Sequence, residues 1–442
     1  MKVKSVTELI GNTPIIEIDK SITGLKNINL FVKCELYNPF GSLKDRAALA
    51  MLEDQLENLK KNGKMVIESS SGNTAKALQL ICSVNHIPFK TVTNRIKIPE
   101  TRDILKIIGA EIEELPGLSE CPDPSDPNDP VAYIERIVSS NPNQYFHTNQ
   151  YTNKKNPETH FLHTGKEIYN DIGSVDYFFG TLGTTGSSKG TIEYLLTKNP
   201  KLTKVGIIAE KGDTIPGIRN KDEMYEVGIF DKNLYDSIIS VNSMDAINGM
   251  LTLNRKLGIL GGPTSGAAYI GAIEYLKTID DTLENPINAV FIACDRVEWY
   301  ISYIKKRRPD IFDSSIKVDS ARSLKQEDLK MAKLIDVNNI EDFLQTEYPI
   351  IIDLRGNLAY KNGHIKGSIN IMDTYFDDII ENGFPFSNES TVLLVCAVGD
   401  KSQQYSAYLN KKGCNVYSLT GGIVGYKEAM LPLTRNLKKD IL

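Results

Sequence analysis

Short apolar runs alternate with helical periodicity along residues 1–306. Segments rich in β-branched and aromatic residues occur at 64–70, 89–93, 176–182, 204–210 and 288–295, and helical patterns such as those at 73–84 and 99–109 lie between them. Continuous apolar strands separated by amphipathic helices are typical of a parallel sheet that is buried on both faces. The pattern therefore predicts an α/β fold with helices covering both faces of a mostly parallel sheet.

A second α/β pattern follows a polar segment. Residues 307–331 contain few large apolar side chains, which is typical of a linker, and strand-like runs then recur at 348–355, 367–371, 391–396 and 415–419. About 110 residues suffice for a small independent domain. We therefore expect a large domain over 1–306, a linker over 307–331 and a small α/β domain over 332–442. The Pro- and Asp-rich segment 116–130 predicts a surface loop.

Composition excludes several classes of protein. A net charge of −5, with no cluster of lysine and arginine, gives no footprint for nucleic acid or an anionic membrane surface. No run approaches the roughly 20 apolar residues that a spanning helix needs, and the N-terminus lacks a signal core, so we expect a cytoplasmic protein. The six cysteines have no metal-ligand spacing, so we expect reduced, mostly buried thiols and no metal site; they are Cys34, Cys82, Cys121, Cys294, Cys396 and Cys414.

Three glycine- and hydroxyl-rich segments lie where strand periodicity gives way to helical periodicity. Their sequences are NPFGSLKDR at 38–46, SSSGNT at 69–74 and GTLGTTG at 180–186. Strand-to-helix turns present free backbone N–H groups and a helix dipole, which suit a phosphate or carboxylate. The third segment is neither a Walker loop nor a dinucleotide fingerprint, because their Gly and Lys spacings differ. Taken singly, each segment fits a tight turn better than it fits a binding site.

The order and spacing of these segments resemble fold type II pyridoxal phosphate enzymes of the cysteine synthase family. The resemblance spans residues 5 to about 305, beginning at ELIGNTP, and implies a tryptophan-synthase-β-like fold with two α/β subdomains. Lys44 corresponds to the lysine that binds pyridoxal 5'-phosphate as a Schiff base, a role that needs an amine kept partly unprotonated. Asn73 corresponds to the asparagine beside the cofactor's 3′-oxygen. The residues that correspond to the phosphate cup are Gly180, Thr181, Gly183, Thr184 and Thr185.

The resemblance also implies substrate ligands. The loop that grips the substrate carboxylate corresponds to Ser70, Ser71, Gly72 and Thr74, with Gln150 as a second ligand. The family places a neutral hydroxyl opposite the pyridine nitrogen, which favours β-elimination. Ser265 is the first choice for this hydroxyl and Asp295 the alternative, with Asp295 expected to be offset from the nitrogen. Leu182 stands where the family often has glycine.

One arginine bears on the substrate. Residues 214–223, TIPGIRNKDE, resemble the mobile active-site loop of the branch that uses O-phosphoserine, and Arg219 occupies the place of its phosphate-binding arginine. The rigid guanidinium fork suits a dianionic phosphate better than an acetyl group. We therefore expect formation of L-cysteine by β-replacement through an aminoacrylate, from O-phosphoserine in preference to O-acetylserine. A solvated loop arginine is the alternative interpretation of Arg219.

The small domain contains a second set of motifs. IIDLRGNLAYKNGHIKGSINI at 351–371, CAVGDKS at 396–402 and GGIVGYKEAMLPL at 421–433 resemble the rhodanese domain, over roughly 332–438. A cysteine between a strand and a helix meets backbone N–H groups and a helix dipole that stabilise a thiolate or persulfide. Related phosphatases place an arginine where Ser402 stands, so Cys396 favours sulfur transfer. Asp353, Arg355 and His364 are expected to be framework residues, with the first two paired, and Lys401, next to Asp400, is either a site for an anionic donor or a solvated lysine.

The two domains together suggest a sulfur relay. Cys396 would carry sulfane sulfur to the β-carbon of the substrate, across a linker that spans on the order of 25 Å and holds the persulfide near millimolar effective concentration. A thiol reductant is then required, because direct transfer leaves a disulfide. The alternatives are a cysteine β-lyase or desulfhydrase, a diaminopropionate-type synthase, or a non-catalytic rhodanese domain that docks a thiocarboxylate sulfur-carrier protein. The resemblance also implies a homodimer.

Overall fold

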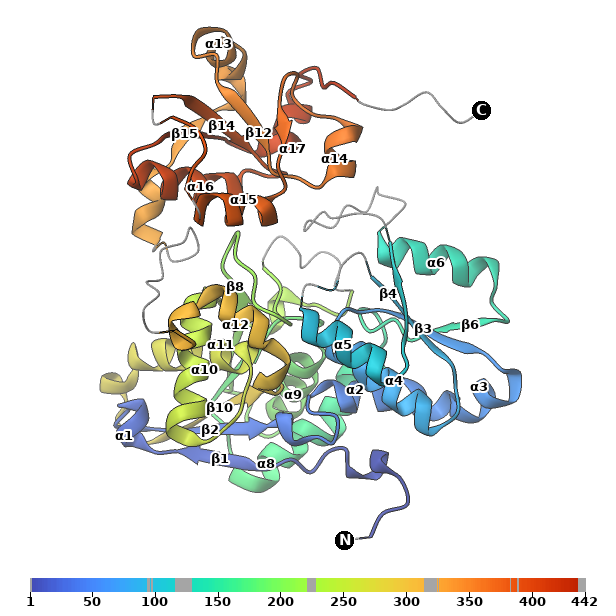
Figure 1. Ribbon diagram of the computed structural model, residues 1–442. Helices are drawn as coiled ribbons and strands as arrows, with labels where there is room; N and C mark the ends of the chain where they lie inside the picture. Colours follow the sequence, from blue (N-terminus) through green and yellow to red (C-terminus); the bar gives the residue numbers. More distant parts are fainter. Residues whose placement is uncertain are drawn as a thin grey trace. The chain divides into compact units, whose positions relative to one another are not determined.

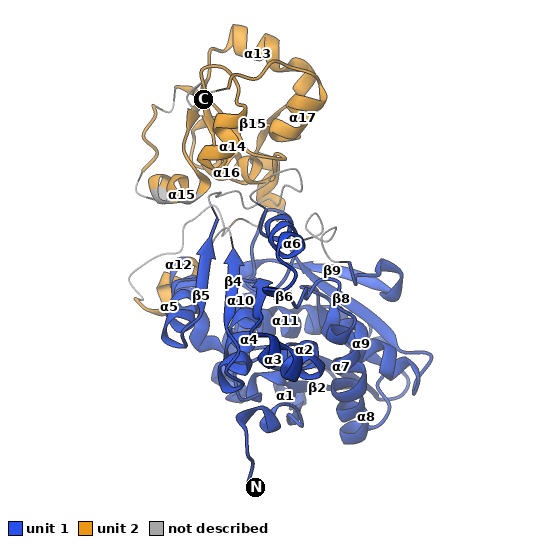
Figure 2. Cartoon of the chain, turned by 90° about the vertical axis from the view of Figure 1, so that its right-hand side faces the viewer, with its two compact units in different colours: residues 1–115, 124–306 blue, residues 116–123, 307–442 orange. Residues whose placement is uncertain are grey.

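The chain forms two compact units. A computed structural model describes residues 2–93, 96, 98–115, 129–220, 228–313, 324, 326–381, 383–387 and 389–435. Unit 1 contains residues 1–115 and 124–306, and unit 2 contains residues 116–123 and 307–442 (Figure 2). Within the ranges described, no helix is both long and apolar enough to cross a membrane.

The larger sheet of unit 1 has six strands in the order β1-β2-β10-β7-β8-β9, of which β1, β2, β8 and β10 are labelled in Figure 1. β1 pairs antiparallel with β2, and every other neighbouring pair is parallel. The strands are β1 (Ile15–Ile18), β2 (Ile28–Cys34), β7 (Tyr177–Thr181), β8 (Thr203–Ala209), β9 (Ser237–Val241) and β10 (Ile287–Ala293).

Both faces of this sheet are buried. On β10, Phe291 packs with apolar side chains of α10 (Ser243–Leu257) and α11 (Pro263–Lys277). Val290 and Ile292 point to the other face, where they pack with α8 (Lys166–Ile172) and α9 (Gly186–Leu196). Because alternate residues of a strand face opposite sides, burial of both faces requires a continuous apolar run. The expected α/β fold is confirmed.

A second sheet of unit 1 has four parallel strands in the order β5-β4-β3-β6. Val66 on β3 packs with residues of α2 (Lys44–Leu52) and α4 (Asn73–Val84), while Ile67 packs on the opposite face with Ile134. The strands are β3 (Met65–Ser69), β4 (Phe89–Thr93), β5 (Glu111–Glu114) and β6 (Tyr145–His147). The remaining helices of unit 1 are α1 (Lys20–Thr23), α3 (Leu56–Asn62), α5 (Pro99–Ile107), α6 (Pro130–Ser140), α7 (Lys155–Thr159) and, across its boundary, α12 (Ile301–Arg307).

Unit 2 is built on a parallel five-stranded sheet in the order β11-β15-β14-β12-β13. Alternate residues of β14 enter two separate apolar clusters, one with α15 and α16 and the other with α13 and α17. The strands are β11 (Lys333–Ile335), β12 (Ile350–Asp353), β13 (Ile369–Asn370), β14 (Thr391–Val395) and β15 (Asn415–Leu419). The helices are α13 (Ile340–Thr346), α14 (Asn357–Asn362), α15 (Asp373–Glu381), α16 (Asp400–Lys411) and α17 (Gly422–Glu428).

Two expected irregular segments are described only in part. Of the loop predicted at 116–130, residues 116–128 lie outside the described residues, Cys121 among them, and α6 begins at Pro130. Of the linker predicted at 307–331, the described portions contain short 3₁₀ turns at Pro309–Ile311 and Gln326–Met331. The five cysteines that the structure describes form no disulfide bond with one another; four are buried, and Cys414 is partly exposed.

Candidate active site

A cavity in unit 1 lies where strand ends from distant parts of the chain meet. It brings together the segments at 38–46, 69–74 and 180–186 that the sequence singled out, because parallel strands direct their carboxyl ends to one edge of a sheet. The residues lining it are Ser42, Leu43, Lys44, Asn73, Thr181, Gly183, Thr184, Thr185, Ser187, Gly217, Thr264, Cys294 and Asp295.

Lys44 is the first residue of α2 and reaches across the cavity. Its Nζ donates to Thr184 Oγ1 at 3.2 Å. The backbone before it is fixed, because the N–H of Leu43 donates to the carbonyl of Cys294. Burial lowers the pKa of the Lys44 amine, against the raising effect of Cys294 and Asp295. A larger fraction of unprotonated amine is what Schiff-base chemistry needs.

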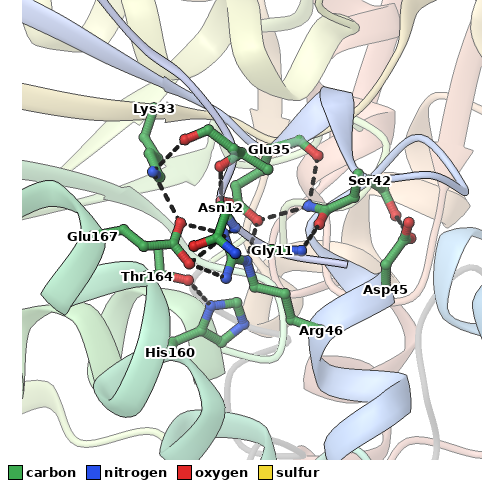
Figure 3. A network of polar contacts seen from close by, with 12 residues as sticks. Gly11, Asn12, Lys33, Glu35, Ser42, Asp45, Arg46, His160, Thr164 and Glu167 are labelled. Atoms are coloured by element: carbon green, nitrogen blue, oxygen red, sulfur yellow. Dashed lines mark hydrogen bonds and ion pairs between the residues drawn. The ribbon is translucent and has the colours of Figure 1, made fainter. Parts of the chain in front are cut away.

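A buried ion-pair network anchors α2 two residues beyond Lys44 (Figure 3). The Arg46 guanidinium donates to both oxygens of Glu35, at 2.7 and 2.9 Å, and to both oxygens of Glu167, each at 2.7 Å. Lys33 from β2 lies 2.9 Å from Glu167. Burial would raise the pKa of Glu167, but the Arg46 hydrogen bonds and charge outweigh it and lower that pKa to about 2. The network joins β2, α2 and α8 around the first turn that carries Lys44.

The loop from Gly180 to Gly186 has the properties of an anion cup. It ends at the N-terminus of α9, where Thr185 adopts φ of +63°, a left-handed conformation that is rare for a β-branched residue. A Cβ on Gly183 would lie 2.4 Å from the carbonyl oxygen of Gly217, so glycine is required there. Leu182, which replaces a family glycine, points into the core.

The cup also holds hydroxyl groups suited to a phosphate. The Thr185 hydroxyl is buried and has no hydrogen-bond partner among the described residues. Asn156, which the sequence motifs did not reveal, donates to Thr184 Oγ1 at 3.2 Å and to the carbonyl of Gln150 at 2.8 Å. A buried hydroxyl without a partner, beside backbone N–H groups and a helix N-terminus, fits a phosphate group.

The loop at 69–74 is held by hydrogen bonds to a neighbouring strand end. Thr74 Oγ1 donates to Gln150 Oε1 at 2.8 Å, and Gln150 Nε2 donates to the carbonyl of Ser69 at 3.0 Å. Ser70 Oγ accepts from the N–H groups of Gly72 and Ala75. The structure thus brings Ser70, Gly72, Thr74 and Gln150 together, with Ser71 exposed beside them.

The first turn of α11 offers two hydroxyls, and they differ in position. Ser265 is fully buried, and its Oγ accepts from the N–H of Cys294 at 2.9 Å. Thr264, one residue earlier, lines the cavity and donates to the carbonyl of Pro216. The sequence favoured Ser265; in the structure Thr264 stands in the cavity wall, because the helix turns by about 100° per residue.

Asp295 also lines the cavity, in a hydrogen-bonded group that the sequence did not predict. Its Oδ2 accepts from Asn73 Nδ2 at 2.7 Å and from the Tyr300 hydroxyl. Burial raises the pKa of Asp295 to about 6. Cys294, beside it, has a thiol whose pKa burial raises to about 12, so the thiol is neutral at physiological pH.

Arg219 lies near Tyr151, the residue after Gln150. Its guanidinium carbon is 5.1 Å from the ring centroid of Tyr151, the neighbour of Gln150. Its N–H donates to the carbonyl of Leu182 at 2.9 Å, so its backbone is hydrogen-bonded to the phosphate-cup loop. Residues 221–223 of the predicted substrate loop lie outside the described residues.

Unit 2 contains a separate cysteine loop. Cys396 follows β14 and is 7% exposed. Its Sγ accepts from the N–H of Gly399 at 3.2 Å and lies 3.4 Å from Ser402 Oγ. Gly399 adopts φ of +98° and precedes α16, so donors and a helix N-terminus surround the sulfur. Ser418 Oγ, which the sequence did not indicate, donates to Ser402 Oγ at 2.7 Å.

The framework residues of unit 2 are placed as expected. Arg355 Nη2 lies 2.7 Å from Asp353 Oδ2 and also donates to the carbonyl of Gly363. His364 Nδ1 lies 2.8 Å from the carbonyl of Tyr360. Lys401 is ion-paired with Asp373, and its side chain is 25% exposed.

Two family models match the chain. The family model of the pyridoxal-phosphate dependent enzyme matches residues 6–295, and that of the rhodanese-like domain matches 325–429. The chain therefore belongs to the pyridoxal-phosphate dependent enzymes and carries a C-terminal rhodanese-like domain.

Relatives narrow the assignment to a cysteine synthase-like enzyme. Cysteine synthase B of Escherichia coli is 31% identical over 304 residues, which are 67% of this chain and 94% of that protein. Cysteine synthase of Aquifex aeolicus is 31% identical over 282 residues, 62% and 84% of the two chains. Among solved structures, a hydrogen sulfide-producing enzyme of Fusobacterium nucleatum has a TM-score of 0.59 at 29% identity, covering 68% of this chain and 99% of its own. Cysteine synthase of Entamoeba histolytica has a TM-score of 0.61 at 26% identity, covering 69% and 90%.

Proposed function

We propose that the enzyme forms L-cysteine from O-phosphoserine by β-replacement, with sulfur carried as a persulfide on Cys396. The position of Arg219 carries the substrate assignment: it stacks on Tyr151 next to Gln150 and is hydrogen-bonded through its backbone to the phosphate-cup loop. A guanidinium there suits a phosphorylated serine whose carboxylate lies against Gln150. O-Acetylserine, which offers no dianionic group, is the second substrate.

The residues of unit 1 divide the work of this reaction. Pyridoxal phosphate supplies an electron sink for the substrate's α-carbon. Lys44 would hold the cofactor, and its amine would serve as the base that removes the α-proton of the substrate. The cup at Gly180–Thr185 binds the cofactor phosphate, and the loop at Ser70–Thr74 orients the substrate carboxylate. Thr264 supplies a neutral hydroxyl in the cavity wall, in place of Ser265.

The rhodanese-like domain supplies sulfur in this proposal. The Gly399 N–H donates to the Cys396 sulfur, so it favours an anionic sulfur there. The absence of an arginine at Ser402 gives a phosphate no bidentate partner. A thiol reductant restores Cys396 after each transfer.

The substrate assignment is tested with Arg219→Met in the full-length holoenzyme. With sulfide as nucleophile, kcat/KM for O-phosphoserine should fall roughly 10- to 100-fold, since charge-assisted hydrogen bonds contribute about 1.5–3 kcal/mol. kcat/KM for O-acetylserine should change little. Arg102→Met, which removes an arginine 37% exposed, is the matched control. A wild-type preference for O-acetylserine, or equal losses with both substrates, would refute the assignment.

The sulfur relay is tested with Cys396→Ser and the control Cys414→Ser. Thiosulfate-dependent cysteine formation in the presence of a thiol should be lost only in the first variant, while sulfide-dependent synthesis stays intact in both. If Cys396→Ser retains thiosulfate-dependent synthesis, the domain is instead a docking module for a sulfur-carrier protein.

A second candidate function runs in the opposite direction. The likeness to the hydrogen sulfide-producing enzyme of Fusobacterium nucleatum favours a cysteine β-lyase on the same scaffold. Sulfide release from L-cysteine that is faster than cysteine synthesis at equal substrate concentrations would favour this function. A diaminopropionate-type synthase is less consistent with the chain, because an amine nucleophile needs no sulfur carrier.

We also propose that the enzyme acts as a homodimer in the cytoplasm, as the resemblance to cysteine synthases implies. Light scattering after size-exclusion chromatography measures the mass directly. A mass near that of one 49.2 kDa chain would contradict the dimer.

A further inference from the structure

Glu68 is a fully buried carboxylate near the carboxyl end of β3. It directly follows the buried apolar residues Val66 and Ile67 in the same strand. Moving a carboxylate from water into a protein interior is costly unless hydrogen bonds or a paired charge compensate it. The burial of Glu68 therefore needs an explanation that apolar packing does not give.

Hydrogen bonds from two separate segments compensate this burial. Glu68 Oε1 accepts from the N–H of Ser69 at 2.9 Å, and Oε2 accepts from the N–H of Gln150 at 3.1 Å. Thr148 Oγ1 also donates to Oε2, at 2.5 Å. Three donors on two oxygens fit an ionised carboxylate, which can only accept. One side chain thus ties the end of β3 to the segment that follows β6.

The two segments that Glu68 holds carry the residues expected to bind the substrate carboxylate. Ser69 leads directly into the loop at Ser70–Thr74, and Gln150 is the second expected ligand. The hydrogen bonds from Thr74 to Gln150 and from Gln150 to the Ser69 carbonyl join the same two segments. Glu68 is the buried acid at the junction of these two segments.

The charge of Glu68 by itself would oppose the binding of a carboxylate nearby. Two negative charges repel each other, so a carboxylate behind this loop weakens the binding of an anionic ligand by its charge alone. His147 Nε2 lies 3.7 Å from Glu68 Oε1 and offsets that charge only when the imidazole is protonated. The benefit of an acid at this position must then come from the backbone geometry that its hydrogen bonds impose.

We infer that Glu68 is a positioning residue that holds the Ser70–Thr74 loop and Gln150 together, so that both meet the carboxylate of one amino-acid substrate. α4 begins at Asn73, and the first N–H groups of a helix have no partner inside the helix, so they suit an anion once the loop is fixed. This role rests on the proposed binding of an amino acid at the loop. It depends on neither the O-phosphoserine assignment nor Cys396.

The test compares two ligands of the full-length holoenzyme that differ only at the carboxyl group. L-Alanine has a carboxylate and no β-leaving group, and L-alaninamide has a neutral amide in its place. Each is titrated while the visible absorption of the cofactor is followed, and the ratio of the two dissociation constants measures the preference for a carboxylate. In Glu68→Gln the side-chain NH₂ faces a backbone N–H in either orientation, so this preference should fall about tenfold.

Controls separate this role from a structural one. Glu57→Gln, which changes a side chain 94% exposed, should keep the wild-type preference. A purely structural Glu68 would lower the thermal midpoint on substitution and leave the preference unchanged. If Glu68→Gln does not fold, Thr148→Val removes one donor to Oε2 and should lower the preference, whereas Thr148→Ser should restore it.

The outcomes also separate this role from the proposed function. An unchanged preference in Glu68→Gln would overturn the inference. An increased preference would overturn it too, because repulsion by the Glu68 charge would then be the main effect. A wild type without any preference for L-alanine would refute the proposed carboxylate loop itself, and the role of Glu68 with it.

Discussion

Replacing Arg46 with methionine tests the network that anchors the first turn of α2. Arg46 is 3% exposed and Glu35 is fully buried, so the variant leaves a buried carboxylate without its cation. Breaking a buried ion pair costs about 3–5 kcal/mol. Glu35 keeps hydrogen bonds from Thr13 and Asn38, and Glu167 keeps Lys33, so the expected loss in free energy of unfolding is near the lower limit, about 3 kcal/mol.

The loss should depend on pH. In the wild type, burial raises the pKa of Glu35, but Arg46 outweighs it and the net pKa is lowered. Carboxylates with lowered pKa values stabilise the fold above their ordinary pKa, and that contribution is lost as pH falls through the folded value. Without Arg46, burial dominates and raises the pKa of Glu35. Protonation at low pH then removes the unpaired buried charge and reduces the destabilisation of the variant. We expect a larger destabilisation at pH 8 than at pH 5.5.

Trp299 makes the measurement specific. It is the single tryptophan of the chain and lies in unit 1, so its fluorescence during urea unfolding follows that unit. Arg102→Met is the control, because Arg102 and Glu114 are both 37% exposed and such pairs contribute about 0–1 kcal/mol. A loss for Arg46→Met equal to that of the control, or independent of pH, would refute the reasoning.

Three further outcomes follow from the site. Lys44→Ala should lose the visible imine absorption and release pyridoxal phosphate on gel filtration; retention of the band would exclude Lys44 as the Schiff-base lysine. Thr264→Val should alter that band, whereas Ser265→Ala should leave it unchanged and lower the free energy of unfolding by about 1–3 kcal/mol, because a buried N–H loses its acceptor; the reverse pattern would restore the sequence assignment. Gly190→Ala should lower the free energy of unfolding by about 3 kcal/mol or more, because a Cβ there would lie 2.0 Å from the carbonyl oxygen of Pro157, and an unchanged urea midpoint would contradict it.

The sheets and the meeting of the glycine loops were predictable from sequence. β10 is apolar on both faces because helices cover both faces of the sheet. A strand buried in this way is a continuous apolar run in the sequence, and such a local pattern can be recognised without the structure. The loops at Ser69–Thr74 and Gly180–Gly186 follow such runs, so parallel pairing brings them to one edge. The order of these segments along the chain also predicts that Lys44 lies at this edge.

The finer site was not predictable, because it depends on tertiary contacts. Whether Thr264 or Ser265 faces the cavity is set by the rotation of α11 against the sheet, which periodicity gives only to within a residue. Lys76 lies on the buried side of α4, where the helical pattern predicts an apolar residue.

The close approach of Gly183 to Gly217 links the binding of the cofactor phosphate to the binding of the amino-acid substrate. The cup loop carries Gly183, and the segment that carries Arg219 lies on it through the Leu182 carbonyl. A phosphate seated in the cup therefore restrains the backbone from which Arg219 extends. The affinities for cofactor and amino acid should then be thermodynamically linked, and each ligand should raise the affinity for the other by the same factor. A substitution that disrupts the cup should therefore weaken substrate binding as well.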